Sequence, residues 1–259
     1  MTTHLYCVLP HDMRESVPQG LSGLAGAQVR AIPVDGIVAW VSDVQREVPV
    51  ALERVREQEL VDGVRAHDAV VEAALETGTT PVPARFGQRF ENDDACRAAL
   101  SSRAASVESL LSMIQGFVEM TLIITPSTRR MIRDLEPMLP DMVEPSIAGA
   151  GRQYLEKLQA RESATGAVRR AMDELAGKLS AAAKRFVERA TVHEQLTRLP
   201  FRTISHLIRR DAVADYKQAV DGVPADQEFR FLLIGPRAPY SFCALSADSG
   251  GMHGMNLAD

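Results

Sequence analysis

The stretch that decides the fold class is "VRAIPVDGIVAWVSDV", residues 29–44, in which two β-branched runs flank Asp35-Gly36. Both central positions of a two-residue hairpin turn adopt positive φ, so an Asp-Gly pair between such runs is a strong hairpin signal. The segment "HLYCVLP", residues 4–10, places another short β-rich run before it. We therefore expect antiparallel strands in the first part of the chain.

Apolar residues at helical spacing follow the hairpin in two places. The first stripe consists of Leu60, Val64, His67, Val71 and Leu75, and a helix opening at Pro49 and ending at Gly78 would carry it. Asn92 or Asp93 is a candidate N-cap for a helix near 94–102. The second stripe consists of Val107, Leu110, Leu111 and Ile114. The run "FVEMTLII", residues 117–124, predicts a further strand.

The segment "PVPARFGQRF", residues 81–90, has two interpretations. As a strand it points Val82, Ala84, Phe86 and Phe90 to one face and its arginines to the other. A bulge at Gly87 would reverse the faces of Arg89 and Phe90. Alternatively, the arginines around the glycine bind an anion. We favour the strand and expect Arg85 to pair with a carboxylate on a neighbouring element, for example Glu119.

The second half of the chain begins with prolines at 126, 137, 140 and 145, which mark a candidate domain boundary. The longest helical pattern follows and predicts a helical hairpin or short coiled coil, with Gly166 as a candidate break. Its apolar positions are Val168, Met172, Leu175, Leu179, Ala182 and Phe186. "FRTISHLI", residues 201–208, predicts a strand, Asp211 a helix cap, and "EFRFLLIGPRAPYSF", residues 228–242, an extended segment.

These elements predict an α+β protein of two domains. A ferredoxin-like domain is expected at 1–125, a proline-rich connector at 126–150, a helical plus β-sheet domain at 151–245 and a disordered tail at 246–259. The second domain would contain the long helical hairpin or coiled coil.

Composition narrows the class of protein. The 259 residues have a formal net charge of −5 and show no basic stripe, which argues against a nucleic-acid partner. No apolar run approaches the ~18 residues needed to span a bilayer, and the first residues do not resemble a signal peptide. Cys7, Cys96 and Cys243 are widely spaced, so we expect reduced thiols in a cytoplasmic protein.

No catalytic or metal-binding motif stands out. The glycines at 20, 23 and 26 lack the neighbours of a phosphate-binding loop, and no histidine or cysteine pair has metal-ligand spacing. His67 reads as a hydrogen-bonded core histidine because it shares the apolar stripe. Methionines accumulate between the prolines, and core packing is one interpretation of them. Exposed together, they would instead form a partner-binding patch: Met131, Met138 and Met142.

As a set, the segments resemble the L/F family of gas vesicle accessory proteins (GvpL/GvpF). The resemblance rests on "GLSGLAG", "VDGIVAWVSDV", "AHDAVVEAAL", "PVPARFGQRF", "GRQYLEKLQAR" and "GPRAPYSF", in that order, across residues 4–243. It implies architectural roles for the motif positions Arg85, Phe86, Gly87, Gly235, Pro236, Pro239, Tyr240, Ser241 and Phe242. Arg237 and the segment 136–145 depart from the family pattern, which leaves the subtype open.

The resemblance also implies a function. It suggests a minor gas vesicle component or assembly factor, in the gas vesicle or cytoplasm, that binds the main shell protein and limits its aggregation during vesicle nucleation. Other accessory proteins are expected partners, and no enzyme activity, cofactor or metal is implied. Two alternatives stay open: a structural shell component, and a ferredoxin-like ligand-binding domain or enzyme using His67, Arg85 and Glu119.

Overall fold

The computed structural model describes residues 1–13, 17–45, 57–127, 150–193, 201–224 and 227–243. They form two compact units, Met1–Glu119 with Pro236–Asp259, and Met120–Gly235. The predicted connector at 126–150 and tail at 246–259 lie almost wholly outside the described residues, so these boundaries stay predictions. None of the described helices combines the length and apolar character that crossing a membrane requires.

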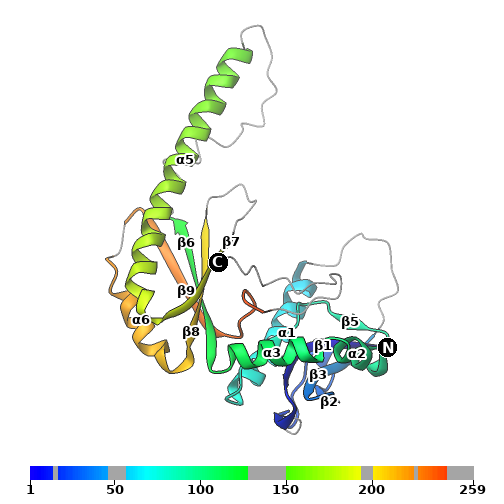
Figure 1. The fold of residues 1–259 in the computed structure, drawn as a ribbon. Helices are drawn as coiled ribbons and strands as arrows, with labels where there is room; N and C mark the ends of the chain where they lie inside the picture. Colours follow the sequence, from blue (N-terminus) through cyan, green and yellow to red (C-terminus); the bar gives the residue numbers. More distant parts are fainter. Residues whose placement is uncertain (14–16, 46–56, 128–149, 194–200, 225–226, 244–259) are drawn as a thin grey trace. The chain divides into compact units, whose positions relative to one another are not determined.

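The first unit is built on one antiparallel sheet (Figure 1). Its strands are β1 (Thr2–Pro10), β2 (Arg30–Val34), β3 (Ile37–Val44), β4 (Val82–Pro83) and β5 (Arg89–Phe90). Its helices are α1 (Glu57–Glu76), α2 (Asp93–Ser101) and α3 (Ala104–Ile114). The strand order is β2-β3-β1-β4, and β5 also pairs with β1. Val34 pairs with Ile37, which confirms the predicted hairpin, but of its two turn residues Gly36 has positive φ, +79°, and Asp35 does not.

Helices cover both faces of this sheet. Leu5 and Val8 of β1 belong to an apolar cluster with Leu100 of α2 and Leu111 of α3. Tyr6 and Leu9 belong to a second cluster, together with Trp40 of β3 and Val70 and Val71 of α1. Successive strand residues point to opposite faces, so β1 supplies both cores and is buried along almost its whole length.

The two shorter helices match their sequence patterns. The Asn92 side chain accepts the Ala95 N–H at 2.9 Å and caps α2. All four apolar residues of the second stripe are buried on α3. On α1, His67, Val71 and Leu75 are buried, whereas Leu60 and Val64 are 51% and 36% exposed. The fully buried residues of α1 begin at His67, and Ala66 packs against the cluster that contains Val71 from a half-buried position.

The segment 81–90 corrects the prediction of one continuous strand. It forms β4 and β5, two short strands that both pair with β1, separated by a turn in which Gly87 has φ +89°. The turn changes the register, so Phe86 packs in the α1 cluster while Phe90 packs in the cluster of α2 and α3. The two phenylalanines therefore lie on opposite faces, not on one.

The second unit contains β6 (Phe117–Pro126), α5 (Ala150–Ala183), β7 (Val187–His193), β8 (Arg202–Arg209), α6 (Val213–Asp221) and β9 (Phe229–Arg237). The first residues of β6 and the last two of β9 belong to the first unit. The sheet order is β7-β8-β6-β9. These described elements follow the β-α-β-β-α-β order of the split βαβ motif. The chain is thus a mixed α and β protein with two antiparallel sheets.

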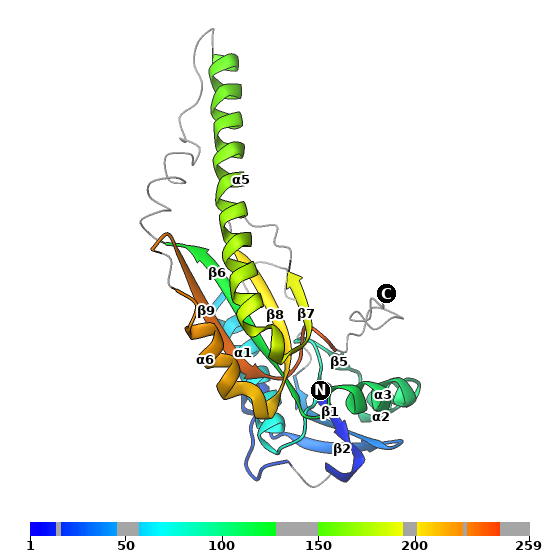
Figure 2. The same cartoon turned by 60° about the vertical axis from the view of Figure 1, so that its left-hand side comes forward.

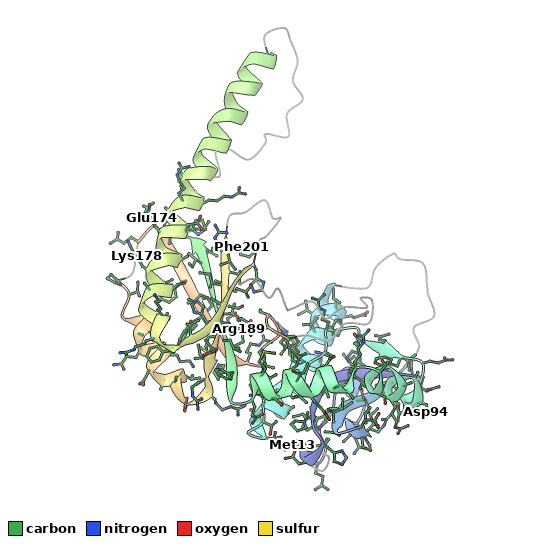
Figure 3. The ribbon with its side chains drawn as sticks, in the orientation of Figure 1. Met13, Asp94, Glu174, Lys178, Arg189 and Phe201 are labelled. Atoms are coloured by element: carbon green, nitrogen blue, oxygen red, sulfur yellow. The ribbon has the colours of Figure 1, made fainter. Side chains whose placement is uncertain are left out.

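Helix α5 is continuous through Gly166, so the glycine does not break it, and a helical hairpin is not confirmed. Its 34 residues span about 51 Å, and it extends beyond the ends of the strands (Figures 1 and 2). Val168, Met172, Leu175 and Leu179 are buried as predicted. The outward face carries charged residues such as Glu174 and Lys178 (Figure 3).

Two further predictions were not met. Asp211 does not cap α6, because it lies in a 3-10 turn, Arg210–Ala212, and pairs with Arg209, while Ala212 precedes the helix. The ferredoxin-like detail of the first domain is also not confirmed. Between β1 and β2 the described residues form two short 3-10 turns, His11–Met13 and Leu24–Gly26, where a crossover helix would be required.

Candidate functional site

The middle of α1 brings together two sequence motifs that lie far apart along the chain, "ARFG" at 84–87 and "GPRAPYSF" at 235–242. His67 lies beside Phe86 of "ARFG", with ring centroids 5.9 Å apart. Its neighbour Asp68 binds Arg237 and Tyr240 of "GPRAPYSF". Because consecutive helix residues point in different directions, one turn of α1 contacts both motifs on separate sides. This group of residues is the candidate functional site.

The first half of the site is a buried histidine pair. His4 Nε2 lies 2.9 Å from His67 Nδ1, and His67 Nε2 lies 3.0 Å from the Ala84 carbonyl oxygen. A carbonyl only accepts, so His67 Nε2 carries the proton and donates it to Ala84. His67 Nδ1 is then an acceptor, and His4 Nε2 must donate to it. These hydrogen bonds fix both tautomers and leave His4 Nδ1 as a buried acceptor without a hydrogen-bond partner among the described residues.

Both imidazoles are held neutral. Burial, with the neighbouring His67 and Arg89, lowers the pKa of His4 to about 3. Burial also lowers the pKa of His67, against the opposing effect of its hydrogen bond to Ala84 and of nearby Asp68. Neither imidazole would carry a positive charge at neutral pH, and the hydrogen bonds of each hold it in the core.

The second half of the site consists of acidic residues of α1 that bind the carboxyl-terminal motif. Asp68 Oδ2 accepts a hydrogen bond of 2.5 Å from Arg237, and Asp68 Oδ1 accepts one of 3.1 Å from the Tyr240 hydroxyl. Glu72, one turn further along α1, lies 3.6 Å from Arg237 Nε. Burial and the Asp68 carboxylate both raise the pKa of Tyr240. Arg237, which departs from the family pattern, is thus anchored to α1 in this chain.

Glu119 holds the next residue of the motif. Its carboxylate accepts the Ser241 N–H at 2.8 Å and the Ser241 hydroxyl at 2.6 Å. Ala238, Phe242 and Cys243 are buried around this contact. The segment after Pro236 is therefore fastened to the first unit by two carboxylates from different elements.

The predicted pairing of Arg85 with Glu119 is wrong. Arg85 is exposed, and Glu119 binds Ser241. His67, Arg85 and Glu119 each have separate surroundings, since His67 is enclosed by His4, Ala84 and Phe86. Met131, Met138 and Met142 lie outside the described residues, so their predicted partner-binding role stays a prediction.

The glycine-rich loop encloses a tyrosine hydroxyl. Tyr6 Oη accepts the Leu24 N–H at 2.8 Å and shares a hydrogen bond of 2.7 Å with the Ser42 hydroxyl. A Cβ at Gly23 would collide with this hydroxyl, so the glycine permits the close approach. The loop satisfies a buried polar group and has no phosphate-binding geometry.

Sequence reasoning missed His4, Tyr6 and Asp68 as members of this site. His4 and His67 are 63 positions apart, and Asp68 and Arg237 are 169 apart. No local spacing signals such pairs. The usable signal in the sequence was that Asp68 lies beside the apolar stripe of α1. A half-buried carboxylate at such a position requires a cationic or hydroxyl partner.

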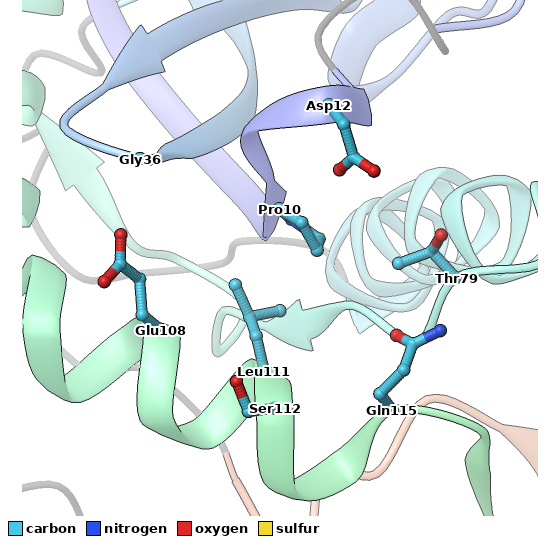
Figure 4. Close-up of a pocket in the computed structure, with 8 residues that line it drawn as sticks. All are labelled: Pro10, Asp12, Gly36, Thr79, Glu108, Leu111, Ser112 and Gln115. Carbon is cyan, nitrogen blue, oxygen red and sulfur yellow. The ribbon is translucent and has the colours of Figure 1, made fainter.

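The cysteines and the surface pocket offer no reactive centre. Burial raises the pKa of Cys96 to about 12 and also raises the pKa of Cys7 and Cys243, so the thiols stay protonated. A pocket of about 420 Å³ lies between the hairpin turn and α3, with Asp12, Glu108 and Gln115 around it (Figure 4). Within the described residues, no group of three potential metal ligands occurs.

The chain is similar to gas vesicle proteins in sequence. It is 24% identical to gas vesicle protein L1 of Halobacterium salinarum over 260 aligned positions, covering 92% of this chain and 89% of that protein. It is 24% identical to gas vesicle protein F of Haloferax mediterranei, covering 88% of each. It is 32% identical to gas vesicle protein F2 of Halobacterium salinarum over 122 residues, which span 46% of this chain and about half, 52%, of that protein.

Solved structures show the same fold. The crystal structure of GvpF from Anabaena matches with a TM-score of 0.72 at 19% identity, over 96% of this chain and 99% of that one. GvpF from Microcystis aeruginosa matches with a TM-score of 0.65 at 18% identity, over 93% and 98%. The model of the family described as gas vesicle synthesis protein GvpL/GvpF matches residues 2–244. The chain therefore belongs to the GvpL/GvpF family of gas vesicle synthesis proteins.

Proposed function

We propose that this protein is a gas vesicle assembly factor that binds the main shell protein and limits its aggregation while the vesicle nucleates. The observation that carries the proposal is the family match across residues 2–244. It is expected to act in the cytoplasm or at the vesicle, alongside other accessory proteins.

The physical argument concerns the shell subunit. A shell that excludes water needs subunits with large apolar faces, which are aggregation hazards before assembly. A folded protein that binds such a face lowers the concentration of free subunit by mass action. A net charge of −5 favours solubility of the complex. Sparing subunits in this way requires comparable amounts of the two proteins.

We further propose that the protein works without catalysis. What supports this is the use of its candidate reactive groups in packing: His67 is enclosed, Glu119 holds Ser241, and the cysteine thiols have raised pKa values. The second candidate function, a ligand-binding domain or enzyme using His67, Arg85 and Glu119, has no converging geometry to support it.

The motif residues enter this proposal as architecture. Tyr240, Ser241 and Phe242 would fasten the end of the described chain to the first unit, and Phe86 would fill the space beside the histidine pair. The methionines at 131, 138 and 142 are proposed to contact the partner. A ferredoxin-like first domain and a helical hairpin in the second domain also remain proposals.

Co-expression with the main shell protein tests the proposal. We expect the shell protein to co-purify with the tagged chain and to move from the pellet to the supernatant. A variant carrying M131S, M138S and M142S should retain less shell protein, whereas the matched change M252S/M255S should retain it fully. Absence of co-purification with the folded wild-type chain would contradict the proposal. Equal retention of shell protein by both variants would contradict the proposed role of the methionines.

A further inference from the structure

Strand β7 lies at one edge of the second sheet, whose order is β7-β8-β6-β9. Four of its seven residues are exposed: Glu188, Arg189, Ala190 and Val192. Val192 is 54% exposed, which is high for a large apolar residue in a strand. An edge strand presents unpaired backbone N–H and C=O groups, so β7 can accept another strand.

The other sheet edges carry the features that prevent such pairing. Strand β2 contains Pro33, and β4 contains Pro83 directly after Pro81 and Val82. Strand β9 includes Gly235-Pro236 near its end. Proline cannot donate to a ladder and is one of the devices that protect edges. Strand β7, "VERATVH", contains neither proline nor glycine. Its register shift lies at its start, between Val187 and Arg189, and from Arg189 to His193 it pairs with β8 in a regular register.

The pairing with β8 assigns the two faces of β7. Ala190 is opposite His206 and Val192 is opposite Ile204. His206 Nδ1 lies 2.8 Å from the Tyr216 hydroxyl of α6, so this is the face that the helices cover. Arg189, Thr191 and His193 point to the other face. The exposed edge is thus apolar on the helix side and polar on the opposite side.

We propose that β7 pairs with β7 of a second copy of this chain, antiparallel, with Thr191 on the two-fold axis. In this register Ala190 faces Val192 of the second copy, Thr191 faces Thr191, and Arg189 faces His193. Residues directly opposite in an antiparallel pair lie on the same face, so the axis must pass through a residue. The pairing joins two four-stranded sheets into one of eight strands.

The sequence of β7 selects this register over its neighbours. An axis through Arg189 would place two arginines opposite each other, which is destabilising. An axis through Ala190 would place the exposed Val192 opposite Glu188. An axis through Val192 would place Ala190 and Arg189 opposite positions beyond the end of β7 at His193. The axis through Thr191 pairs the two exposed apolar residues, Ala190 and Val192, within the strand and keeps the two arginines apart. A self-complementary edge is what an isologous two-fold contact requires.

The contact is small, because it rests on one pair of strands. Interfaces below about 1,200 Å² are typical of weak or transient association. We therefore expect a reversible dimer whose fraction rises with protein concentration. Disulfide trapping suits such a contact, and Cys7, Cys96 and Cys243 are all buried, so a cysteine introduced on β7 would be the exposed thiol of the described residues.

The test uses T191C under mild oxidation. Two Thr191 positions on the axis face each other as a direct cross-strand pair, within reach of a disulfide, so we expect a rapidly formed covalent dimer. E188C is the matched control on the same strand, because the two copies of residue 188 would lie about 20 Å apart. L232C is the control on the opposite edge, where residue 232 is 58% exposed.

A dimer of T191C that forms much faster than those of E188C and L232C supports the proposal. Equal rates for all three variants, or fastest linkage of L232C, would overturn it. Sedimentation of the wild-type chain provides the second measurement: dimers should appear as concentration rises and should be lost in V192K. A wild-type chain that stays monomeric, with V192K losing only shell-protein binding, would assign the edge to that partner and refute self-pairing.

Discussion

The two units of this chain use their sheets differently. In the first unit, helices cover both faces of the sheet, and proline occurs in the edge strands β2 and β4. In the second unit, α5 and α6 share one face, and both edge strands expose a large apolar residue, Val192 on β7 and Leu232 on β9. Proline occurs in edge strands of the first unit and near the end of β9 in the second, whereas β7 is an edge strand without proline.

The largest expected difference between the units is in how the free energy of unfolding depends on pH, because the units contain different buried histidines. The first unit contains His4 and His67, and the second contains His206, all with pKa values lowered by burial. Between pH 6.5 and about 3 the unfolded chain binds protons that the native His4 does not. Stability is therefore full above pH 6.5 and falls as pH drops. At pH 5 the loss from His4 alone should reach about 2 kcal/mol.

The single tryptophan makes this measurable. Trp40 is fully buried in the first unit, so its fluorescence during denaturant unfolding reports on that unit. The free energy of unfolding should be lower at pH 5 than at pH 7.5. H206F removes the buried histidine of the second unit and should leave this pH dependence unchanged. A wild-type stability that does not vary across this range would contradict the assignment of neutral histidines.

Adding a single methyl group at Gly23, in the glycine-rich loop of the first unit, should destabilise the fold. In G23A the new Cβ would collide with the Tyr6 hydroxyl, and relieving the overlap should cost about 1–3 kcal/mol. Y6F removes the hydroxyl, so G23A should cost much less in the Y6F background. Chemical denaturation of the four proteins in this double-mutant cycle measures the coupling. Additive effects would show that the close approach is unimportant.

Removing the contacts of Asp68 with the carboxyl-terminal motif should have the next largest effect on the free energy of unfolding. D68A leaves Arg237 and the Tyr240 hydroxyl without their acceptor, which should cost about 1–2 kcal/mol. E72A is the matched control one turn along α1, and its exposed pair should be worth less than about 0.5 kcal/mol. Thermal unfolding compares them, and equal losses would contradict the central role of Asp68.

The edges of the second unit should contribute least to folding. V192K and L232K change exposed positions, so each should alter the free energy of unfolding by no more than about 0.5 kcal/mol. Their effect should appear in association, where V192K weakens self-pairing and L232K does not. A large stability loss in either variant would mean that these side chains belong to the fold of the unit.

The sequence predicted the elements that depend on neighbouring residues. The Asp35-Gly36 hairpin, the Asn92 cap and the buried stripe of α3 follow from local turn chemistry and helical spacing. The elements it misjudged depend on tertiary context. Helix α5 continues through Gly166, because a mid-helix glycine costs only about 1 kcal/mol, which the other residues of a long helix can offset. The turn at Gly87 divides the predicted strand, and Phe86 then packs on the opposite face.

The candidate site was predictable only in part. The two motifs were visible in the sequence, but their meeting on α1 was not, because the partners lie 63 and 169 positions apart. Glu119 was recognised as a partner for an arginine, yet the structure gives it the backbone N–H and hydroxyl of Ser241. Long-range pairs of this kind depend on the tertiary structure and have no local sequence pattern from which they could be predicted.

A titration of main shell protein with the purified chain tests the central claim most directly, with light scattering as the readout. Binding that spares subunits from aggregation predicts that scattering falls in proportion to added chain and is abolished near equimolar amounts. Suppression by a small fraction of an equivalent would indicate turnover, and undiminished scattering at excess would indicate no binding. Either result would contradict a stoichiometric assembly factor.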